Sequence, residues 1–124
     1  MTSLQQARTV DDLLLEAIDE TMVNLFSREV DEALYLHLQR FYSVGRHEVP
    51  KKLETLCVVL EKTFGGPNSK TISRAIAKRF YAKLELHFPK HVSSSLTLSA
   101  YVEDAKLTLR NRNRRPGVQE KKAR

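Results

Sequence analysis

Apolar residues recur every three or four positions through most of the chain, and this spacing constrains the fold more than any other feature. It is the period of an α-helix with one buried face, whereas a half-buried strand shows strict alternation, which does not persist anywhere in the sequence. About 100 residues of this pattern bury enough apolar surface to fold without disulfides or a structural metal. We therefore predict an all-α fold, a compact bundle of about five helices in residues 1–109.

Capping residues mark the first two predicted helices. The first covers residues 9–25, with Thr9 as its N-cap, and the second begins near Ser27 and ends at Gly45. Ser27 is followed three positions later by Val30, so the serine caps the helix without forming a capping box. The predicted buried stripes are Leu14, Ile18, Met22 and Leu25 in the first helix, and Val30, Leu34, Leu38 and Phe41 in the second.

Prolines and glycines separate the remaining predicted helices. Pro50 is expected in the first turn of the third helix, and Gly65, Gly66 and Pro67 separate it from the fourth. The fourth helix is expected to be capped by Asn68 or Ser69 and to end before Pro89, and the fifth covers residues 98–109. The predicted buried stripes are Leu53, Leu56, Cys57, Leu60 and Phe64, then Ile72, Ala75, Ile76 and Phe80, then Leu98, Val102, Ala105 and Leu109.

The positive charge of the chain is concentrated at its C-terminal end. Residues 106–124 contain eight Lys and Arg and the single acid Glu120, a charge of +7 out of a total of +6, which leaves −1 for residues 1–105. The apolar spacing stops after Leu109, so residues 110–124 are predicted to be a disordered basic tail. This tail is expected either to bind a polyanion, an acidic protein or an anionic membrane surface, or to have no partner. Its candidate binding residues are Arg110, Arg112, Arg114, Arg115, Lys121 and Lys122.

A second group of cations lies in the predicted fourth helix. Lys70, Arg74 and Lys78 follow one another at four-residue intervals, with Arg79 and Lys83 beside them. This spacing predicts a basic ridge opposite the apolar stripe of that helix. The ridge favours nucleic-acid binding, because the third helix, the glycine link and a basic fourth helix resemble a helix-turn-helix unit. A charged outer face is also the ordinary property of a surface helix.

No residue pattern in the sequence is typical of an enzyme or a metalloprotein. His87 and His91 have the four-residue spacing of helical metal ligands, but Pro89 between them disrupts a helix. Cys57 shares an apolar stripe, which predicts a packed and inert thiol, and a single cysteine forms no internal disulfide. We expect no metal, no cofactor and no catalysis.

The sequence also predicts the cellular compartment of the protein. The longest apolar runs, residues 13–15 and 57–60, are far too short to span a bilayer, and no basic start precedes an apolar signal segment. A soluble, cytoplasmic protein is therefore expected.

Four short motifs carry a resemblance to a known family: residues 14–20, 33–38, 48–50 and 60–65. With them, residues 13–86 resemble the fifth of the Nitrosopumilus output-domain families. The resemblance implies an archaeal, all-helical domain that occurs alone or joined to signalling modules as an output element, and it implies no catalytic residue. The sequence departs from the family at residues 66–68, where Gly-Pro-Asn replaces a glycine-alanine helix start.

These observations together predict a non-enzymatic helical output or interaction module, whose basic tail contacts an acidic protein partner. The alternative is a nucleic-acid-binding regulator that uses the helix at residues 68–87 together with the tail. The two hypotheses predict different surfaces. An interaction module should expose an apolar groove among its helices, whereas a nucleic-acid-binding protein should carry the ridge and the start of the tail on one face.

Overall fold

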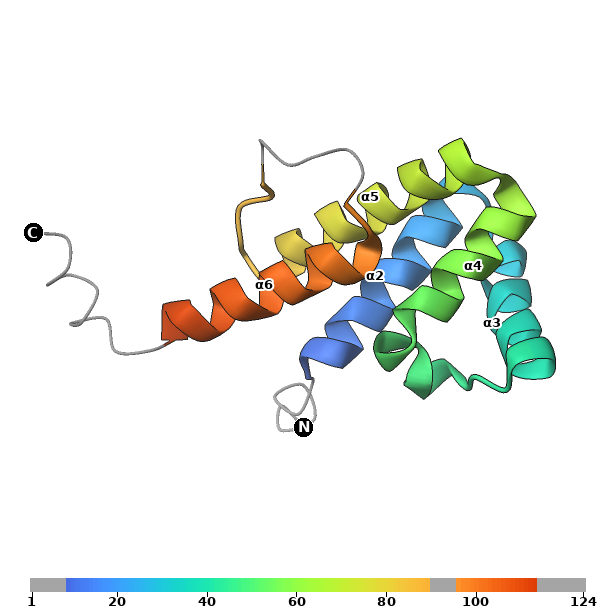
Figure 1. The fold of residues 1–124 in the computed structure, drawn as a ribbon, viewed down its shortest axis with the longest axis horizontal. Coiled ribbons are helices and arrows are strands. Elements are labelled where there is room, and N and C mark those ends of the chain that lie inside the picture. Colours follow the sequence, from blue (N-terminus) through green and yellow to red (C-terminus); the bar gives the residue numbers. More distant parts are fainter. Residues whose placement is uncertain (1–8, 90–95, 114–124) are drawn as a thin grey trace, which may run out of the picture.

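The structure, a computed structural model, describes residues 9–89 and 96–113 of the 124-residue chain. These residues form helices and no strand, so the prediction of an all-α fold is confirmed. In chain order the elements are α2 (Val10–Leu25), α3 (Arg28–Tyr42), the 3₁₀-helix η1 (Arg46–Lys51), α4 (Leu53–Phe64), α5 (Gly66–Lys83) and α6 (Leu98–Asn113) (Figure 1).

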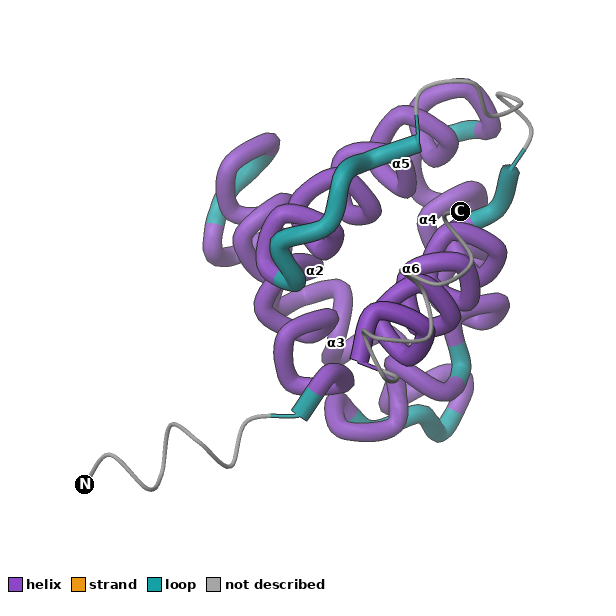
Figure 2. Tube along the Cα trace, turned by 90° about the vertical axis from the view of Figure 1, so that its left-hand side faces the viewer, coloured by secondary structure: helices purple, strands orange, loops and turns teal. Residues whose placement is uncertain are grey.

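Helix α2 connects most of the bundle. It packs against α5, α3 and η1, while α4 packs against α5 and α6. Helix α6 lies along α5, and residues 84–89 turn back over α5, which brings Phe88 near Arg74 and Lys78 (Figure 2). Helix α3 lies at one end of the molecule and the C-terminal end of α6 at the other (Figure 1). The two ends therefore present different surfaces.

The starts of α2 and α3 follow the predicted capping chemistry. The Thr9 hydroxyl accepts a hydrogen bond from the backbone N–H of Asp12, and the Asp12 carboxylate accepts one from the N–H of Thr9, a reciprocal capping box. The Ser27 hydroxyl accepts from the N–H of Val30 at 3.1 Å and forms no such box, as predicted. Each cap satisfies a backbone donor that has no partner inside its helix.

The boundary between α3 and α4 differs from the prediction. Helix α3 ends at Tyr42, and Ser43 closes it in a left-handed conformation with φ 56°. Gly45 instead precedes η1, where its N–H donates to the Glu48 carboxylate at 2.8 Å. Pro50 lies inside η1 and not in the first turn of α4. The predicted C-cap at Gly45 and helix start at Pro50 are therefore wrong, because a short 3₁₀-helix occupies the predicted loop.

The boundaries of α5 and α6 also differ. Helix α5 begins at Gly66, and Gly65, with φ 90°, forms the joint with α4. Asn68 is therefore no cap, and its side-chain amide donates to the Phe64 carbonyl at 2.9 Å. Ser69 likewise lies inside the helix. Helix α6 continues to Asn113, so residues 110–113 of the predicted tail are helical, while residues 114–124 lie outside the described part.

Most residues of the predicted stripes are buried or pack against the core, but Ala75 is only partly buried and two further residues are exposed. Phe41 is 65% exposed and Leu25 is 49% exposed. Leu38 and Tyr42 both face the core, because residues four positions apart lie nearly on the same side of a helix. Phe41 is one position before Tyr42, so its side chain points away from the core. Leu25 is the last residue of α2, where the chain leaves the bundle. The fully buried residues include Leu14, Ile18, Met22, Leu38, Leu56, Leu60, Ile76, Phe80 and Leu98.

Candidate functional site

The predicted basic ridge of α5 is divided between two surroundings. Arg79 and Lys83 face α2, where the Arg79 guanidinium lies 3.4 Å from Glu20 and the Lys83 ammonium lies 2.9 Å from Glu20 and 3.3 Å from Glu16. The hydrogen bond from Lys83 is the main reason that the pKa of Glu20 is below its usual value. These two cations hold α5 against α2, so they do not belong to a free ridge.

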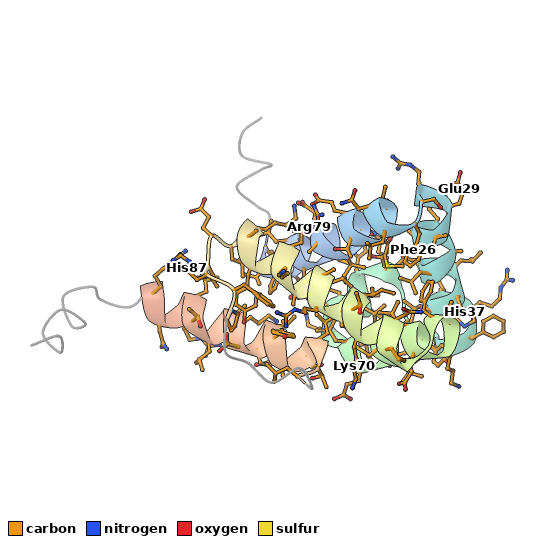
Figure 3. The ribbon with its side chains drawn as sticks, turned by 90° about the horizontal axis from the view of Figure 1, so that it is seen from above. Phe26, Glu29, His37, Lys70, Arg79 and His87 are labelled. Atoms are coloured by element: carbon orange, nitrogen blue, oxygen red, sulfur yellow. The ribbon has the colours of Figure 1, made fainter. Side chains whose placement is uncertain are left out.

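The other three cations of the ridge form what we call the α5 cation row: Lys70, Arg74 and Lys78. None of them makes an ion pair with another residue in the described part of the chain. The Arg74 guanidinium donates a hydrogen bond to the Tyr101 hydroxyl at 3.2 Å and lies 5.1 Å from the centre of the Phe88 ring. The Lys78 ammonium lies 5.9 Å from the same ring. Arg74 and Lys78 are thus oriented by cation–π contacts and not by neutralising acids. Lys70 and Arg79 are labelled in Figure 3.

Three aromatic rings support this row. The Phe88 ring lies between Tyr81, edge-on at 5.3 Å, and Tyr101, stacked at 5.2 Å. The Tyr81 hydroxyl donates to the backbone carbonyl of Tyr101 at 2.9 Å and contacts the Asp104 carboxylate. Burial and the Asp104 carboxylate raise the pKa of Tyr81. Sequence reasoning missed Phe88 and Tyr101, although an aromatic residue just before Pro89 in a predicted loop was the available signal.

The first two cations of the predicted tail lie in α6 and contact different parts of the fold. Arg112 donates to the backbone carbonyls of Glu85 at 3.2 Å and Leu84 at 3.5 Å, so it satisfies acceptors just after α5. Arg110 lines a hollow with the first residues of α2. The two side chains therefore do not join the α5 cation row into one patch. The four remaining tail residues, Arg114, Arg115, Lys121 and Lys122, lie outside the described residues.

A second surface is apolar and lies around α3. Of the seven exposed large apolar residues in the described part, five fall in residues 23–41: Val23, Leu25, Phe26, Leu36 and Phe41. Phe26 stacks on Phe64 with ring centres 4.7 Å apart, whereas Leu36 and Phe41 point away from the core and are 57% and 65% exposed.

We call Leu36, His37 and Phe41 the apolar face of α3; it is a broad surface, because Leu36 and Phe41 are five positions apart and lie about 140° apart around the helix. The His37 and Phe41 rings lie 4.7 Å apart, and His37 is labelled at the outer edge of the molecule in Figure 3. The opposite side of α3 packs against α2 and α4. The surface is an exposed helix face and not the groove that the interaction hypothesis predicted.

A cluster of ionisable groups joins α2, α3 and η1. Asp31 is only 7% exposed, and its Oδ1 atom and the hydroxyl of Tyr35 are buried without a hydrogen-bond partner among the described residues. Both Asp19 carboxylate oxygens accept from Arg46, at 2.7 and 3.1 Å, and the Arg46 guanidinium lies 4.9 Å from the centre of the Tyr35 ring. Asp19 is therefore paired with Arg46, whereas Asp31 has no cation of its own and interacts with the Asp19 carboxyl.

The two carboxyls of this cluster have opposite pKa shifts. Burial and the adjacent Asp19 carboxyl raise the pKa of Asp31 to about 7. Burial also raises the pKa of Asp19, but Arg46, with Tyr35 and Asp31 nearby, outweighs burial and brings it below its usual value. Sequence reasoning missed this pair, because Asp31 has the position of an ordinary first-turn acid, which the helix dipole stabilises.

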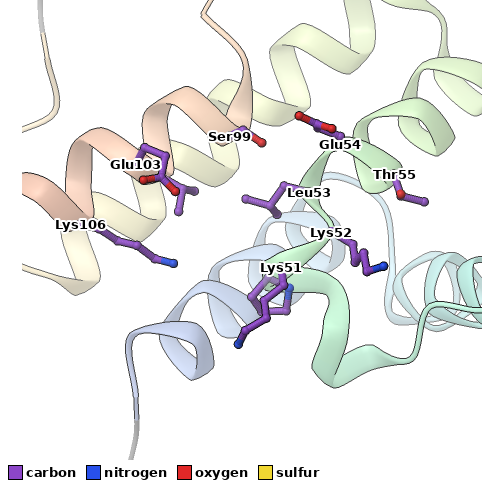
Figure 4. A pocket seen from close by; sticks show the side chains of 10 residues that line it. Lys51, Lys52, Leu53, Glu54, Thr55, Ser99, Glu103 and Lys106 are labelled. Atoms are coloured by element: carbon purple, nitrogen blue, oxygen red, sulfur yellow. The ribbon is translucent and has the colours of Figure 1, made fainter.

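The hollow between the start of α4 and α6, about 380 Å³, has mixed charge (Figure 4). Lys51 and Lys106 both reach Asp11, at 3.2 and 3.5 Å, while Glu54 from α4 and Glu103 from α6 also line the hollow. Alternating signs favour no particular ligand charge. No cluster of three His, Cys, Asp or Glu suited to a metal occurs in the described residues.

Two further side chains considered in the sequence analysis are Cys57 and His87. Burial raises the pKa of the Cys57 thiol, whose sulfur lies 3.9 Å from the Ser73 hydroxyl, and a raised pKa opposes nucleophilic reactivity. His87 is exposed, and His91, four positions later, lies outside the described residues.

Two further findings concern membranes and relatives. None of the helices in the described ranges is long and apolar enough to cross a membrane. Comparisons with protein-family models, with curated proteins and with solved structures find no match, so they assign the chain to no family.

Proposed function

We propose that this chain is a non-enzymatic interaction module that binds an acidic, amphipathic helix of a protein partner through the apolar face of α3. The observation that carries the proposal is the exposure of Leu36 and Phe41, on a helix whose other side is packed. In line with the resemblance to the output-domain family, we propose that the module acts in archaeal signalling in the cytoplasm.

The chemistry of α3 favours this type of partner. Burying an exposed Leu or Phe side chain contributes roughly 1.5–3 kcal/mol, and aromatic residues often provide most of an interface's binding energy. Arg40, between Leu36 and Phe41 in sequence, is exposed and makes no ion pair with a described residue. A partner helix with one apolar side and a flanking carboxylate would satisfy both features.

Site-directed crosslinking and two matched serine variants test this proposal. A photo-crosslinking amino acid at position 36, compared with one at position 107, identifies the partner in cells that naturally make the protein. Phe41→Ser is then compared with Leu107→Ser, because Leu107 is exposed to a similar extent, 51%, but lies on α6. We expect Phe41→Ser to weaken the purified complex about 10- to 100-fold and Leu107→Ser to leave it within about twofold.

Three outcomes would contradict the proposal: equal effects of the two variants, crosslinking at position 107 in place of position 36, or crosslinks only to a second copy of the chain. Circular dichroism of both variants shows whether the helices remain folded.

A second candidate function, a nucleic-acid-binding regulator, is favoured by the α5 cation row. Three cations at helical spacing without ion pairs to described residues leave their charges available for phosphates. The row is smaller than the predicted ridge, because Arg79 and Lys83 contact α2. Neither Arg110 nor Arg112 extends it, which makes this function the second choice.

Salt-dependent binding of duplex DNA and single-stranded RNA tests the second candidate. Replacing Lys70, Arg74 and Lys78 with glutamine should reduce the slope of log affinity against log salt by up to about 3, since each phosphate contact contributes nearly one unit. The control replaces Arg28 and Arg40, two exposed arginines of α3. The same slope in both variants would show that the row does not bind nucleic acid.

A further inference from the structure

A small hollow lies between α5, α6 and the residue pair that precedes α6. Its volume is about 220 Å³, and it is lined by Lys70, Thr71, Arg74, Leu96 and Tyr101. A water molecule occupies about 30 Å³ in the liquid, so the hollow accommodates a group of several heavy atoms. In contrast to the hollow beside α4, no carboxylate is among its described lining residues. Its electrostatics therefore favour an anion.

The hydroxyl of Tyr101 is the most constrained polar group in this hollow. Tyr101 is 3% exposed, and its oxygen accepts a hydrogen bond from Arg74 at 3.2 Å. The hydroxyl proton has no acceptor among the described residues. A phenol that already accepts from a guanidinium has only this proton left for a strong new hydrogen bond, and such a bond requires an acceptor in the ligand.

The two cations add donors around the same space. Arg74 uses one of its five N–H groups on Tyr101, and its guanidinium is held near the Phe88 ring, so its position is set before a ligand binds. Lys70 lies one helical turn earlier on the same side of α5 and provides three N–H donors. The Thr71 hydroxyl already donates to the Pro67 carbonyl at 3.2 Å, so it provides no further donor.

We propose that Lys70, Arg74 and the Tyr101 hydroxyl form a binding site for a compact phosphate group. Two cations and one neutral donor at three separate positions match the several oxygens of a tetrahedral phosphate. A planar carboxylate has only two oxygens for the same donors. The phosphate belongs either to a small phosphorylated molecule or to a nucleic-acid backbone, which share this chemistry. The site is independent of the apolar face of α3.

Titration of the full chain with inorganic phosphate and with adenosine monophosphate tests the site, followed by amide and arginine side-chain NMR signals and by calorimetry. Both probes should shift the signals of Tyr101 and of the Arg74 side chain. Arg74→Gln should weaken binding at least about tenfold, and Tyr101→Phe, which keeps the ring, about three- to tenfold. Arg40→Gln serves as the control for loss of one positive charge and should leave binding within about twofold.

Competition with a short DNA duplex separates the two sources of phosphate. If the duplex displaces adenosine monophosphate and its own binding depends on Tyr101 and Arg74, the site takes backbone phosphates. If it fails to do so, the site takes a small phosphorylated molecule. The proposal is overturned if phosphate shifts no signal at Tyr101, or if the Arg40 variant loses as much affinity as the Arg74 variant, because binding would then reflect net charge alone.

Discussion

Replacing Asp31 with asparagine is expected to remove most of the pH dependence of folding stability that arises between about pH 4 and pH 7. Asp31 is buried, its Oδ1 atom has no partner among the described residues, and its pKa is raised to about 7. An unfolded chain gives the same carboxyl an ordinary pKa near 4. The folded protein therefore binds a proton in this range that the unfolded chain does not bind.

The sign of the effect follows from proton linkage. Where the native state binds more protons, stability falls as pH rises, so the carboxyl is best tolerated below about pH 4 and imposes its full cost above about pH 7. A shift of about three units corresponds to about 4 kcal/mol as an upper value, and we expect about 2–4 kcal/mol. Asp19 contributes in the opposite direction and at lower pH. Its pKa is lowered in the folded protein, so the stability that it contributes is lost as the pH falls below the pKa of an ordinary carboxyl.

Several charged groups surround the Asp31 carboxyl, and they bear on the comparison of wild type with the asparagine variant. Asp19 from α2 and Glu32 from α3 raise its pKa, while Arg46 from η1 lowers it. A shallow hollow beside the carboxyl also brings in other charged side chains, namely Glu20, Arg28 and Arg79. All of these groups are present in both proteins, but Asp19 interacts directly with Asp31, so the difference in stability measures the titration of Asp31 together with its effect on Asp19.

Urea unfolding of wild type, Asp31→Asn and Glu32→Gln at pH 4, 5.5, 7 and 8 measures this difference. From pH 4 to pH 8, the free energy of unfolding of the asparagine variant should increase by about 2–4 kcal/mol relative to that of the wild type. Glu32 is exposed on the same helix, so its variant should run parallel to the wild type within about 0.5 kcal/mol. A constant difference between wild type and Asp31→Asn over the whole range would mean that folding leaves the pKa of Asp31 unchanged.

The comparison of sequence with fold shows which physical signals are local. Thr9 and Ser27 cap helices as predicted because a cap depends only on residues within one turn. Most residues of the stripes of α2, α4 and α5 are buried because their spacing alone selects one side of a helix. Phe41 and Tyr42 are adjacent apolar residues, and only the packing of α3 on its neighbours decides which one points inward. The sequence likewise did not predict the left-handed conformation of Ser43, because glycine normally occupies that position at the end of a helix.

The candidate sites were less predictable because their partners are distant in sequence. The spacing of Lys70, Arg74 and Lys78 predicted a row of cations, but not that Arg79 and Lys83 contact glutamates about 60 positions earlier. The hollow at Tyr101 and the pair of Asp19 with Asp31 each arise where two helices meet. Helical periodicity assigns a residue to the inside of the bundle, but it does not identify which residue of another helix lies opposite.

The second large effect is expected at Tyr81, where α5, the segment after it and α6 meet. Its side chain is 1% exposed, its ring contacts Phe88, and its hydroxyl bonds to α6 at the Tyr101 carbonyl and the Asp104 carboxylate. Tyr81→Ala removes the ring and leaves a cavity, which should cost about 3–5 kcal/mol. Tyr81→Phe removes only the hydroxyl, and because Asp104 is exposed and remains hydrated, the cost should be about 1–2 kcal/mol.

Chemical unfolding and amide hydrogen exchange of the two Tyr81 variants measure both the size and the location of this effect. If α6 is an integral part of the domain, Tyr81→Ala lowers the stability of all helices together, because α6 covers core residues of α4 and α5. Tyr42→Ala is the control, since Tyr42 is only half-buried, and it should cost no more than about 1–2 kcal/mol. Loss of protection in α6 alone, with α2 to α5 unaffected, would instead mean that residues 98–113 are a separable addition to the bundle formed by α2 to α5.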